Sequence, residues 1–152
     1  MKNILRIFIN HLAVSTALLA ATQVQAAELQ VEVSHIKIFN KPVYVRVYQV
    51  SPAMADQKKW PEQAEYEMKH MPLHKSVILE FGPVEPGMYF IAVYQDLNNN
   101  NELDKTSKGV PKEPYALSNN PVLSKNPCLG KLMFEVNSEA KHVSIRLRGG
   151  KK

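Results

Sequence analysis

The stretch VYVRVYQV, residues 43–50, alternates valine with tyrosine, arginine or glutamine over most of its length. Successive side chains of a β-strand point to opposite faces, so Val43, Val45 and Val47 share one face of such a strand. Tyr44 and Arg46 would then lie on the opposite face. β-Branched and aromatic residues also favour the extended backbone. The stretch therefore predicts a strand that buries one face in a core.

The same period of two recurs along the chain, in residues 29–34, 76–81, 131–136 and 142–147. Residues 88–95, MYFIAVYQ, are instead apolar on both faces, which is typical of a central strand. Strands with turn signals between them, and no alternation with long helices, predict an all-β fold. We expect an antiparallel β-sandwich of about six to seven strands. The turn residues 40–42 predict a hairpin between the strands at 29–34 and 43–50.

Residues 51–75 interrupt the strand pattern. Trp60, Ala64 and Met68 fall at four-residue spacing, and Pro61 suits the first position of a helix. We therefore expect one short helix that covers an open end of the sandwich, with Trp60 as its main anchor.

The N-terminus has the features of a secretory signal peptide. Lys2 and Arg6 precede the mostly apolar residues 7–21, and Val24 and Ala26 occupy the small-residue positions that signal peptidase reads. Cleavage after Ala26 divides the chain into a signal peptide, residues 1–26, and a single β-sandwich domain, residues 27–152. The predicted location is periplasmic or secreted, where the partner would be an envelope protein or glycan.

The alternative for the N-terminus is a membrane-spanning helix. Asn10 and His11 interrupt its apolar run, which falls short of the roughly 20 residues that a span needs. Cleavage would remove two basic residues and no acidic ones, which lowers the net charge from +5 to +3. An excess of that size does not point to nucleic acid, and no membrane span is expected after cleavage.

Cys128 is the one cysteine of the chain, so no intramolecular disulfide can form. Free cysteines are often buried as small apolar residues. We expect that role for Cys128, and the alternative is a thiol that pairs between chains.

The loop DLNNNNELD, residues 96–104, has the spacing of a calcium loop. Asp96, Asn98, Asn100 and Asp104 fall at positions 1, 3, 5 and 9 of that pattern, where alternate oxygens converge on one hard cation. With the backbone carbonyl of residue 102 and a carboxylate from farther along the chain, the candidate metal ligands are Asp96, Asn98, Asn100, Glu102, Asp104 and Glu113.

Two positions of this loop depart from the calcium pattern. Asn101 stands where glycine is usual, and Ser107 stands where a glutamate normally closes the loop. The sequence therefore predicts calcium binding that is weak. The alternative is a polar turn in which asparagine side chains bond to the local backbone.

The loop and the residues after it also resemble a known family. The motif combines a Gly-x-Tyr strand, an Asp/Asn loop, a Gly-x-Pro-x-Glu segment and Ser-Asn-Asn. The matching positions are Gly87, Tyr89, Asp96, Asn98, Asn100, Leu103, Asp104, Gly109, Pro111, Glu113, Tyr115, Ser118, Asn119 and Asn120. The chain is similar here to the secreted bacterial family called domain of unknown function 2141. Gln95, Asn101, Pro114 and the pair 116–117 depart from its pattern.

What the resemblance implies is a fold and not an activity, because the family has none assigned. The run PGMYFIAVY also looks like transthyretin-like and carboxypeptidase-regulatory sandwiches. The resemblance therefore implies the same sandwich architecture that the period of two predicts.

Two other chemistries remain as alternatives. Met68, His70, Met71 and His74 lie close in sequence, and thioether and imidazole groups suit copper. We interpret the two methionines as core residues on the predicted helix instead. No motif of a catalytic nucleophile or zinc enzyme occurs, and we assign no catalytic residue.

We therefore expect a non-enzymatic binding module whose specificity lies in residues 96–120. No cofactor is firmly indicated, and calcium is the one candidate. The competing hypothesis is a hydrolase-type envelope enzyme with a site built from the same loop. An enzyme should show a concave pocket with a convergent acid and histidine, whereas a binding module should show a shallow polar surface.

Overall fold

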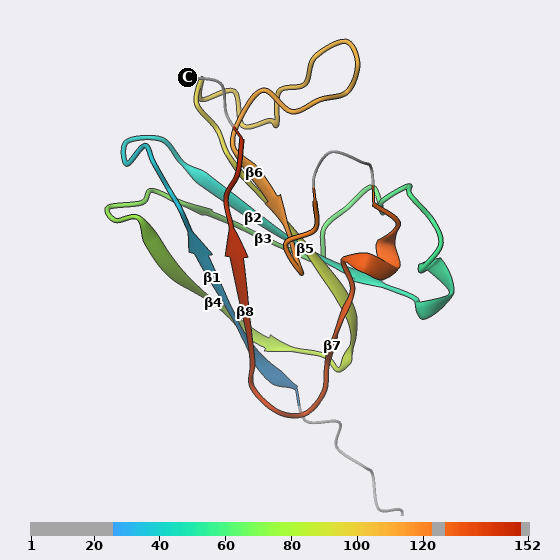
Figure 1. Ribbon diagram of the computed structural model, residues 1–152. Coiled ribbons are helices and arrows are strands. Elements are labelled where there is room, and N and C mark those ends of the chain that lie inside the picture. The colour runs from blue at the N-terminus through green and yellow to red at the C-terminus, as the bar shows by residue number, and fades with distance from the viewer. Residues whose placement is uncertain (1–25, 123–126, 150–152) are drawn as a thin grey trace, which may run out of the picture.

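The computed structural model describes residues 26–122 and 127–149, and these residues form eight strands in two facing sheets (Figure 1). The strands are β1 (Ala27–Ser34), β2 (Val43–Val50), β3 (Tyr66–His70), β4 (Ser76–Val84), β5 (Gly87–Gln95), β6 (Tyr115–Leu117), β7 (Phe134–Val136) and β8 (Lys141–Arg146). The all-β sandwich predicted from the sequence is confirmed. Within the described residues, the only helical elements are two short 3₁₀ turns, η1 (Pro52–Met54) and η2 (Leu129–Lys131).

The first sheet has the strand order β4-β1-β8. β1 pairs with β4 in the antiparallel sense and with β8 in the parallel sense. The prediction of a purely antiparallel sandwich is therefore wrong at this one pairing. The chain reaches β8 by way of the other sheet, and such a return can place the last strand in either direction.

The second sheet has the order β3-β2-β5-β6, and β7 also pairs with β5. All four pairings are antiparallel. β5 therefore lies at the centre of this sheet, as its two apolar faces predict.

The core lies between the two sheets. The valines of 43–50 that share one face, Val43, Val45 and Val47, are buried there against Val31 and Val33 of the first sheet. β1, β7 and β8 alternate buried and more exposed residues, whereas β2 and β5 are buried on most of both faces. The period of two in the sequence correctly identified the core-facing valines of β1 and β2.

The predicted hairpin between β1 and β2 is wrong, because the two strands belong to different sheets. Residues 35–42 cross from the first sheet to the second instead of turning back beside β1. Two consecutive strands with one apolar face each can pair in the same sheet, or they can lie in different sheets whose apolar faces pack across the core. Periodicity alone does not distinguish the two arrangements.

The predicted helix in residues 51–75 is also wrong. The segment contains η1, an irregular stretch and then β3, which pairs along the edge of β2. Met68 packs against the core from this strand, while Glu67 and Lys69 face outward. Pairing with the open edge of β2 satisfies a row of backbone groups, which outweighs a weak helical spacing.

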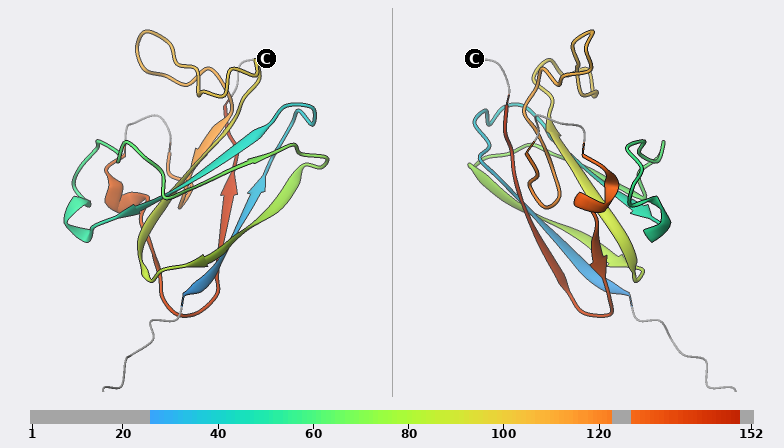
Figure 2. Two further views of the ribbon diagram at one scale, coloured as in Figure 1. Left: turned by 180° about the vertical axis from the view of Figure 1, so that it is seen from behind. Right: turned by 45° about the vertical axis from the view of Figure 1, so that its right-hand side comes forward.

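The outer face of the second sheet has its own apolar cluster. Tyr48 and Phe90 stack there with ring centroids 4.6 Å apart, and Trp60 meets Phe90 edge-on at 5.4 Å. Leu129 and Leu132 complete the cluster from the η2 side. The backbone N–H of Leu129 donates to the Gln57 carbonyl at 2.8 Å, so the segments around η1 and η2 lie side by side (Figure 2). Trp60 is thus an anchor, although of a loop and not of a helix.

The predicted signal peptide falls on residues 1–26, of which all but Ala26 lie outside the described residues. Within residues 26–122 and 127–149, no helix has the length and hydropathy required to cross a bilayer.

Candidate functional site

The asparagine-rich loop leaves the second sheet where β5 ends and returns to it at β6 (Figure 1). It occupies residues 96–114 and is tied to the sheet at both ends. The N–H of Gln95 donates to the Pro114 carbonyl and the N–H of Asp96 donates to the Pro42 carbonyl, each at 2.9 Å. Hydrogen bonds therefore fix both ends of the loop at the end of the central strand β5.

Asp96 is fully buried and holds the loop from inside. Its Oδ1 accepts the backbone N–H of Asn99 at 2.6 Å, and its Oδ2 accepts the N–H of Asn101 at 2.8 Å. Asn99 and Asn101 both adopt left-handed backbone conformations, with φ of 63° and 64°. Asparagine tolerates this region better than most residues. Asn101 thus reproduces the turn for which calcium loops use glycine.

Glu113 holds the same loop from its other end. This carboxylate is 4% exposed, and its Oε1 accepts the N–H of Leu97 at 2.6 Å while its Oε2 accepts the N–H of Asp104 at 3.1 Å. Asp96 and Glu113 together accept four backbone N–H groups. Their visible role is to fix the shape of the loop.

Asn98, Asn100 and Asp104 come together at the outer side of the loop. The Nδ2 groups of Asn98 and Asn100 donate to Asp104 Oδ2 and Oδ1, at 2.6 Å and 3.3 Å. Their Oδ1 atoms accept the N–H groups of residues 100 and 102, at 3.1 Å and 3.0 Å. These are the local side-chain to backbone bonds of an asparagine-rich turn.

The structure thus separates the six predicted ligands into two groups. Asn98, Asn100 and Asp104 are in contact, whereas Asp96 and Glu113 bond to backbone N–H groups, and Glu102 has an exposed side chain. Among residues 26–122 and 127–149, no three His, Cys, Asp or Glu side chains are grouped closely enough to hold a metal ion by themselves. Any cation in this loop would therefore depend on amide and backbone oxygens as well.

A pair of stacked tyrosines, which the sequence pattern does not reveal, supports the loop. Tyr44 and Tyr94 lie opposite each other on β2 and β5, with parallel rings 4.9 Å apart. Tyr44 donates its hydroxyl to Asn101 Oδ1 at 2.5 Å, and Tyr94 donates to the Asn101 carbonyl at 2.9 Å. Burial raises the pKa of Tyr94 to about 12. The period of two correctly placed Tyr44 on the outer face. That Tyr94 lies opposite it follows only from the register of β2 against β5.

Two cations lie over these rings. Lys69 Nζ is 5.2 Å from the Tyr44 centroid and donates to Asn101 Oδ1 at 3.1 Å. The Arg46 guanidinium is 5.4 Å from the Tyr94 centroid and pairs with Glu67 at 2.5 Å. Cations over aromatic faces are attracted by the ring quadrupole. β2, β3 and β5 therefore all support the loop through Asn101.

Met68 packs against the core, as expected, but the same expectation for Met71 is wrong, because Met71 is 50% exposed. Met71 and His74 lie in the connection between β3 and β4, so the four residues considered as an alternative copper site do not share one face. Cys128, for which we expected burial, is a partly exposed free thiol directly before η2.

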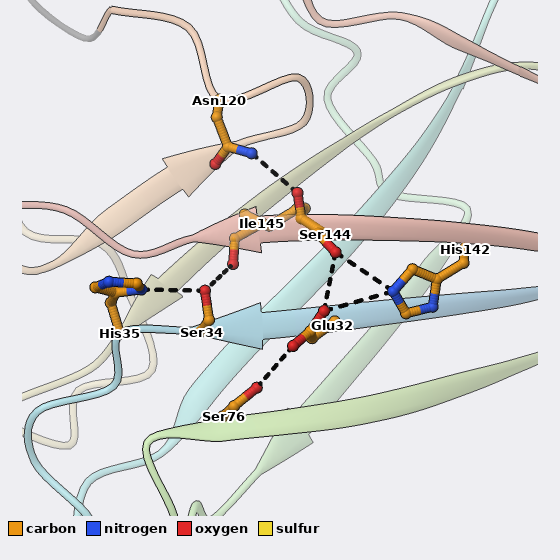
Figure 3. A network of polar contacts seen from close by, with 8 residues as sticks. All are labelled: Glu32, Ser34, His35, Ser76, Asn120, His142, Ser144 and Ile145. Atoms are coloured by element: carbon orange, nitrogen blue, oxygen red, sulfur yellow. Dashed lines mark hydrogen bonds and ion pairs between the residues drawn. The ribbon is translucent and has the colours of Figure 1, made fainter.

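A separate polar network lies on the outer face of the first sheet (Figure 3). Glu32 accepts hydrogen bonds from Ser144 at 2.9 Å and from Ser76 at 3.2 Å, and it pairs with His142 at 3.5 Å. The bonds from Ser144, Ser76 and His142 lower the pKa of Glu32. Ser144 and Glu32 both face Nε2 of His142, whereas a nucleophilic triad places the acid at the other ring nitrogen. The network is thus not arranged as a triad.

Comparison with protein families places most of the chain in one of them. The model of an uncharacterized protein family conserved in bacteria, DUF2141, matches residues 31–144. The chain belongs to the DUF2141 family. Comparison with curated proteins and with solved structures gave no match.

The Ser-Asn-Asn motif by which the chain resembled DUF2141 has structural partners. Ser118 Oγ donates to the Leu132 carbonyl at 2.6 Å and accepts the N–H of Ile91 at 3.0 Å. Asn120 Nδ2 donates to the Ser144 carbonyl and its Oδ1 accepts the N–H of Arg146. Ser118 therefore joins β5 to the η2 segment, and Asn120 joins the end of β6 to β8 in the other sheet. These motif residues stabilise the DUF2141 sandwich beside the loop.

Proposed function

We propose that the protein is exported to the periplasm or secreted, and that it acts as a non-enzymatic, transthyretin-like binding module. The observation that carries this proposal is the loop 96–114, whose backbone is fixed by the buried carboxylates of Asp96 and Glu113. A loop of fixed shape on a rigid sheet loses little conformational entropy when it binds a partner. Its exposed amides, from Asn98 to Asn101, offer hydrogen-bonding groups to an envelope protein or glycan.

We further propose that the loop binds calcium weakly. The amide N–H groups of Asn98 and Asn100 donate to the Asp104 carboxylate. The same negative charge would attract a cation. Rotation of both amides would place two carbonyl oxygens beside that carboxylate, which is the donor set that calcium prefers. The rotation breaks the two bonds that the Oδ1 atoms accept from the backbone. That cost supports a weak site.

The alternative is an envelope hydrolase with a site built from residues 96–120, which would need an acid, a histidine and a nucleophile that act on one substrate atom. Residues 96–120 contain no histidine, so that group would have to come from another part of the chain. The ion pair of His142 and Glu32 lies on the outer face of the first sheet, and both of its partners contact Ser144. This geometry favours a surface network, so the binding module is the better-supported function.

The test of binding uses the immobilised purified protein and an envelope extract, with calcium or with chelator. Asp104→Asn removes a charge from the loop without removing a bond to the backbone, and Glu139→Gln removes an exposed charge elsewhere. The proposal expects a partner that the wild type and Glu139→Gln retain and that Asp104→Asn loses. Capture that is equal for all three proteins would place binding outside the loop.

Export is tested separately by the intact mass of the protein recovered from the envelope fraction. The expected chain begins at Ala27, because Val24 and Ala26 suit signal peptidase. A chain that retains Met1 would contradict cleavage.

A further inference from the structure

Two connections lie next to each other at one end of the sandwich. Residues 35–42 lead from β1 to β2, and residues 71–75 lead from β3 to β4. β1 and β4 are neighbours in the first sheet, and β2 and β3 are neighbours in the second. Both connections therefore run between the two sheets, next to each other. The N–H of Ile36 donates to the Lys75 carbonyl at 3.1 Å and joins them. Both views of Figure 2 show the two loops side by side, and we call them the paired tips.

The paired tips expose large apolar side chains. Ile38 and Phe39 on the first loop are 38% and 41% exposed, and Met71 and Leu73 on the second are 50% and 77% exposed. Single exposed apolar residues are ordinary on protein surfaces, whereas a group of them on adjacent loops marks an interaction site.

The charge of the paired tips has one sign. Lys37 and Lys41 flank the apolar residues of the first loop, and Lys75 follows those of the second. Neither residues 35–42 nor residues 71–75 contain aspartate or glutamate. Such a surface complements a partner that has negative charges at its surface, which the lysines can contact, and an apolar layer beneath them, which the apolar side chains can enter.

The exposure of these side chains is fixed by the residues beneath them. Ile36 and Pro72, one from each loop, are buried and anchor the tips. Fully buried Gln95 donates through Nε2 to the carbonyls of Ile38 and Lys41, at 2.5 Å and 3.1 Å. The first loop is thus held with Ile38 and Phe39 facing solvent, and it cannot fold them onto the core without breaking these bonds.

We propose that the paired tips dock on the surface of an anionic phospholipid bilayer. The apolar side chains enter the boundary between headgroups and acyl chains, and the three lysines remain among the lipid phosphates. Protruding loops suit an interface that deforms around them, whereas a protein partner would need a matching groove. The proposal does not depend on calcium or on the loop 96–104.

The test is sedimentation of the purified protein with vesicles, its N-terminus established by intact mass. Vesicles of mixed phosphatidylglycerol and phosphatidylcholine should bind the protein, and pure phosphatidylcholine vesicles should bind it much less. Raising the salt from about 0.1 M to about 1 M should weaken binding, because the screening length falls from about 10 Å to about 3 Å. Chelator should have no effect.

Two pairs of variants separate the paired tips from the rest of the surface. Lys37→Gln with Lys75→Gln should weaken binding by about 25-fold, at about fivefold for each lysine. The control with the same net charge, Lys58→Gln with Lys131→Gln, should bind as the wild type does. Phe39→Ser with Leu73→Ser should weaken binding at least about tenfold. The matched apolar control is Ile78→Ser, on the outer face of β4.

Three results would overturn the proposal. The first is a wild-type protein that does not sediment with the anionic vesicles. The second is equal weakening by the lysine variants and their control, which would reduce binding to net charge alone. The third is a concentration-dependent dimer that Phe39→Ser with Leu73→Ser abolishes while vesicle binding is unchanged, which would assign the paired tips to a second copy of the chain. Unaltered melting temperatures of the variants establish that they fold.

Discussion

The buried carboxylate of Asp96 holds the backbone N–H of Asn101 at 2.8 Å, and Asn101 in turn contacts the hydroxyls of Tyr44 and Tyr94. The acid at the start of the loop therefore positions the residue that connects the loop to the outer face of the sheet. The Asp104 carboxylate, in the same loop, instead accepts hydrogen bonds from the side-chain amides of Asn98 and Asn100. The two acids have different structural roles, although both stand at ligand positions of the calcium pattern.

This difference predicts unequal effects on stability. Asp96→Ala leaves the N–H groups of Asn99 and Asn101 without their acceptor, and we expect it to lower the free energy of unfolding by about 1–3 kcal/mol. Asp104→Ala removes bonds between partly exposed side chains and should cost less than about 1 kcal/mol. Denaturant titration in chelator measures both. Equal losses would show that Asp96 does not hold the loop as its geometry indicates.

Trp60 is expected to hold the segment between β2 and β3 on the outer face of the second sheet. Its ring contacts Phe90 and Tyr48 at centroid distances of 5.4 Å and 6.3 Å, but it is only partly buried. Trp60→Ala should therefore cost about 3 kcal/mol, the low end of the range for buried aromatic residues. Trp60→Phe, which keeps an aromatic ring, should cost less. An unchanged denaturant midpoint in Trp60→Ala would show that the segment is detached from the sheet in solution.

Glu32 is expected to make stability depend on acid pH. Hydrogen bonds from Ser144 and Ser76 lower its folded-state pKa, so folding favours the ionised carboxylate. The stabilisation is fully present above the ordinary glutamate pKa of about 4.3 and is lost as the pH falls through the lowered value. The wild type should lose stability over that acid range relative to Glu32→Gln. A ¹³C titration of the Glu32 carboxyl that gives an ordinary pKa would contradict the network.

The period of two in the sequence was sufficient to predict the sandwich and its core faces. It correctly placed the valines of β2 in the core and β5 at the centre of a sheet. It did not specify which strands pair, because β1 and β2 satisfy the same pattern in different sheets. The parallel pairing of β1 with β8 likewise depends on the path of the whole chain.

The sequence indicated where the candidate site lies, but it did not indicate what all of the predicted ligand side chains contact. Spacing identified the loop and brought Asn98, Asn100 and Asp104 together. It did not reveal that Asp96 and Glu113 bond to backbone N–H groups, because those bonds depend on how the loop folds back against β5. Tyr44 and Lys69 were missed for a related reason, since they reach Asn101 from other strands.

Calcium should stabilise the protein modestly. With amide ligands and Ser107 at the closing position, the dissociation constant should lie near the range of extracellular modules, about 10⁻⁴–10⁻³ M. A value of about 0.1 mM gives about 1.4 kcal/mol at about 1 mM calcium, from RT ln(1 + [L]/Kd). For a domain of this size that is a melting shift of about 4–6 °C.

Thermal melts in chelator and in millimolar calcium measure this shift, and two variants assign it. Asp104→Ala should abolish the shift while it leaves the melt in chelator nearly unchanged, because its carboxylate holds no backbone group. Asp96→Ala should abolish the shift and also lower the melt in chelator, because Asp96 builds the loop. Magnesium is the matched ion, and it should act less because it demands stricter geometry and gives up its water reluctantly. A wild type that does not respond to calcium would establish the asparagines as a structural turn, and variants that respond as the wild type does would place calcium at other residues.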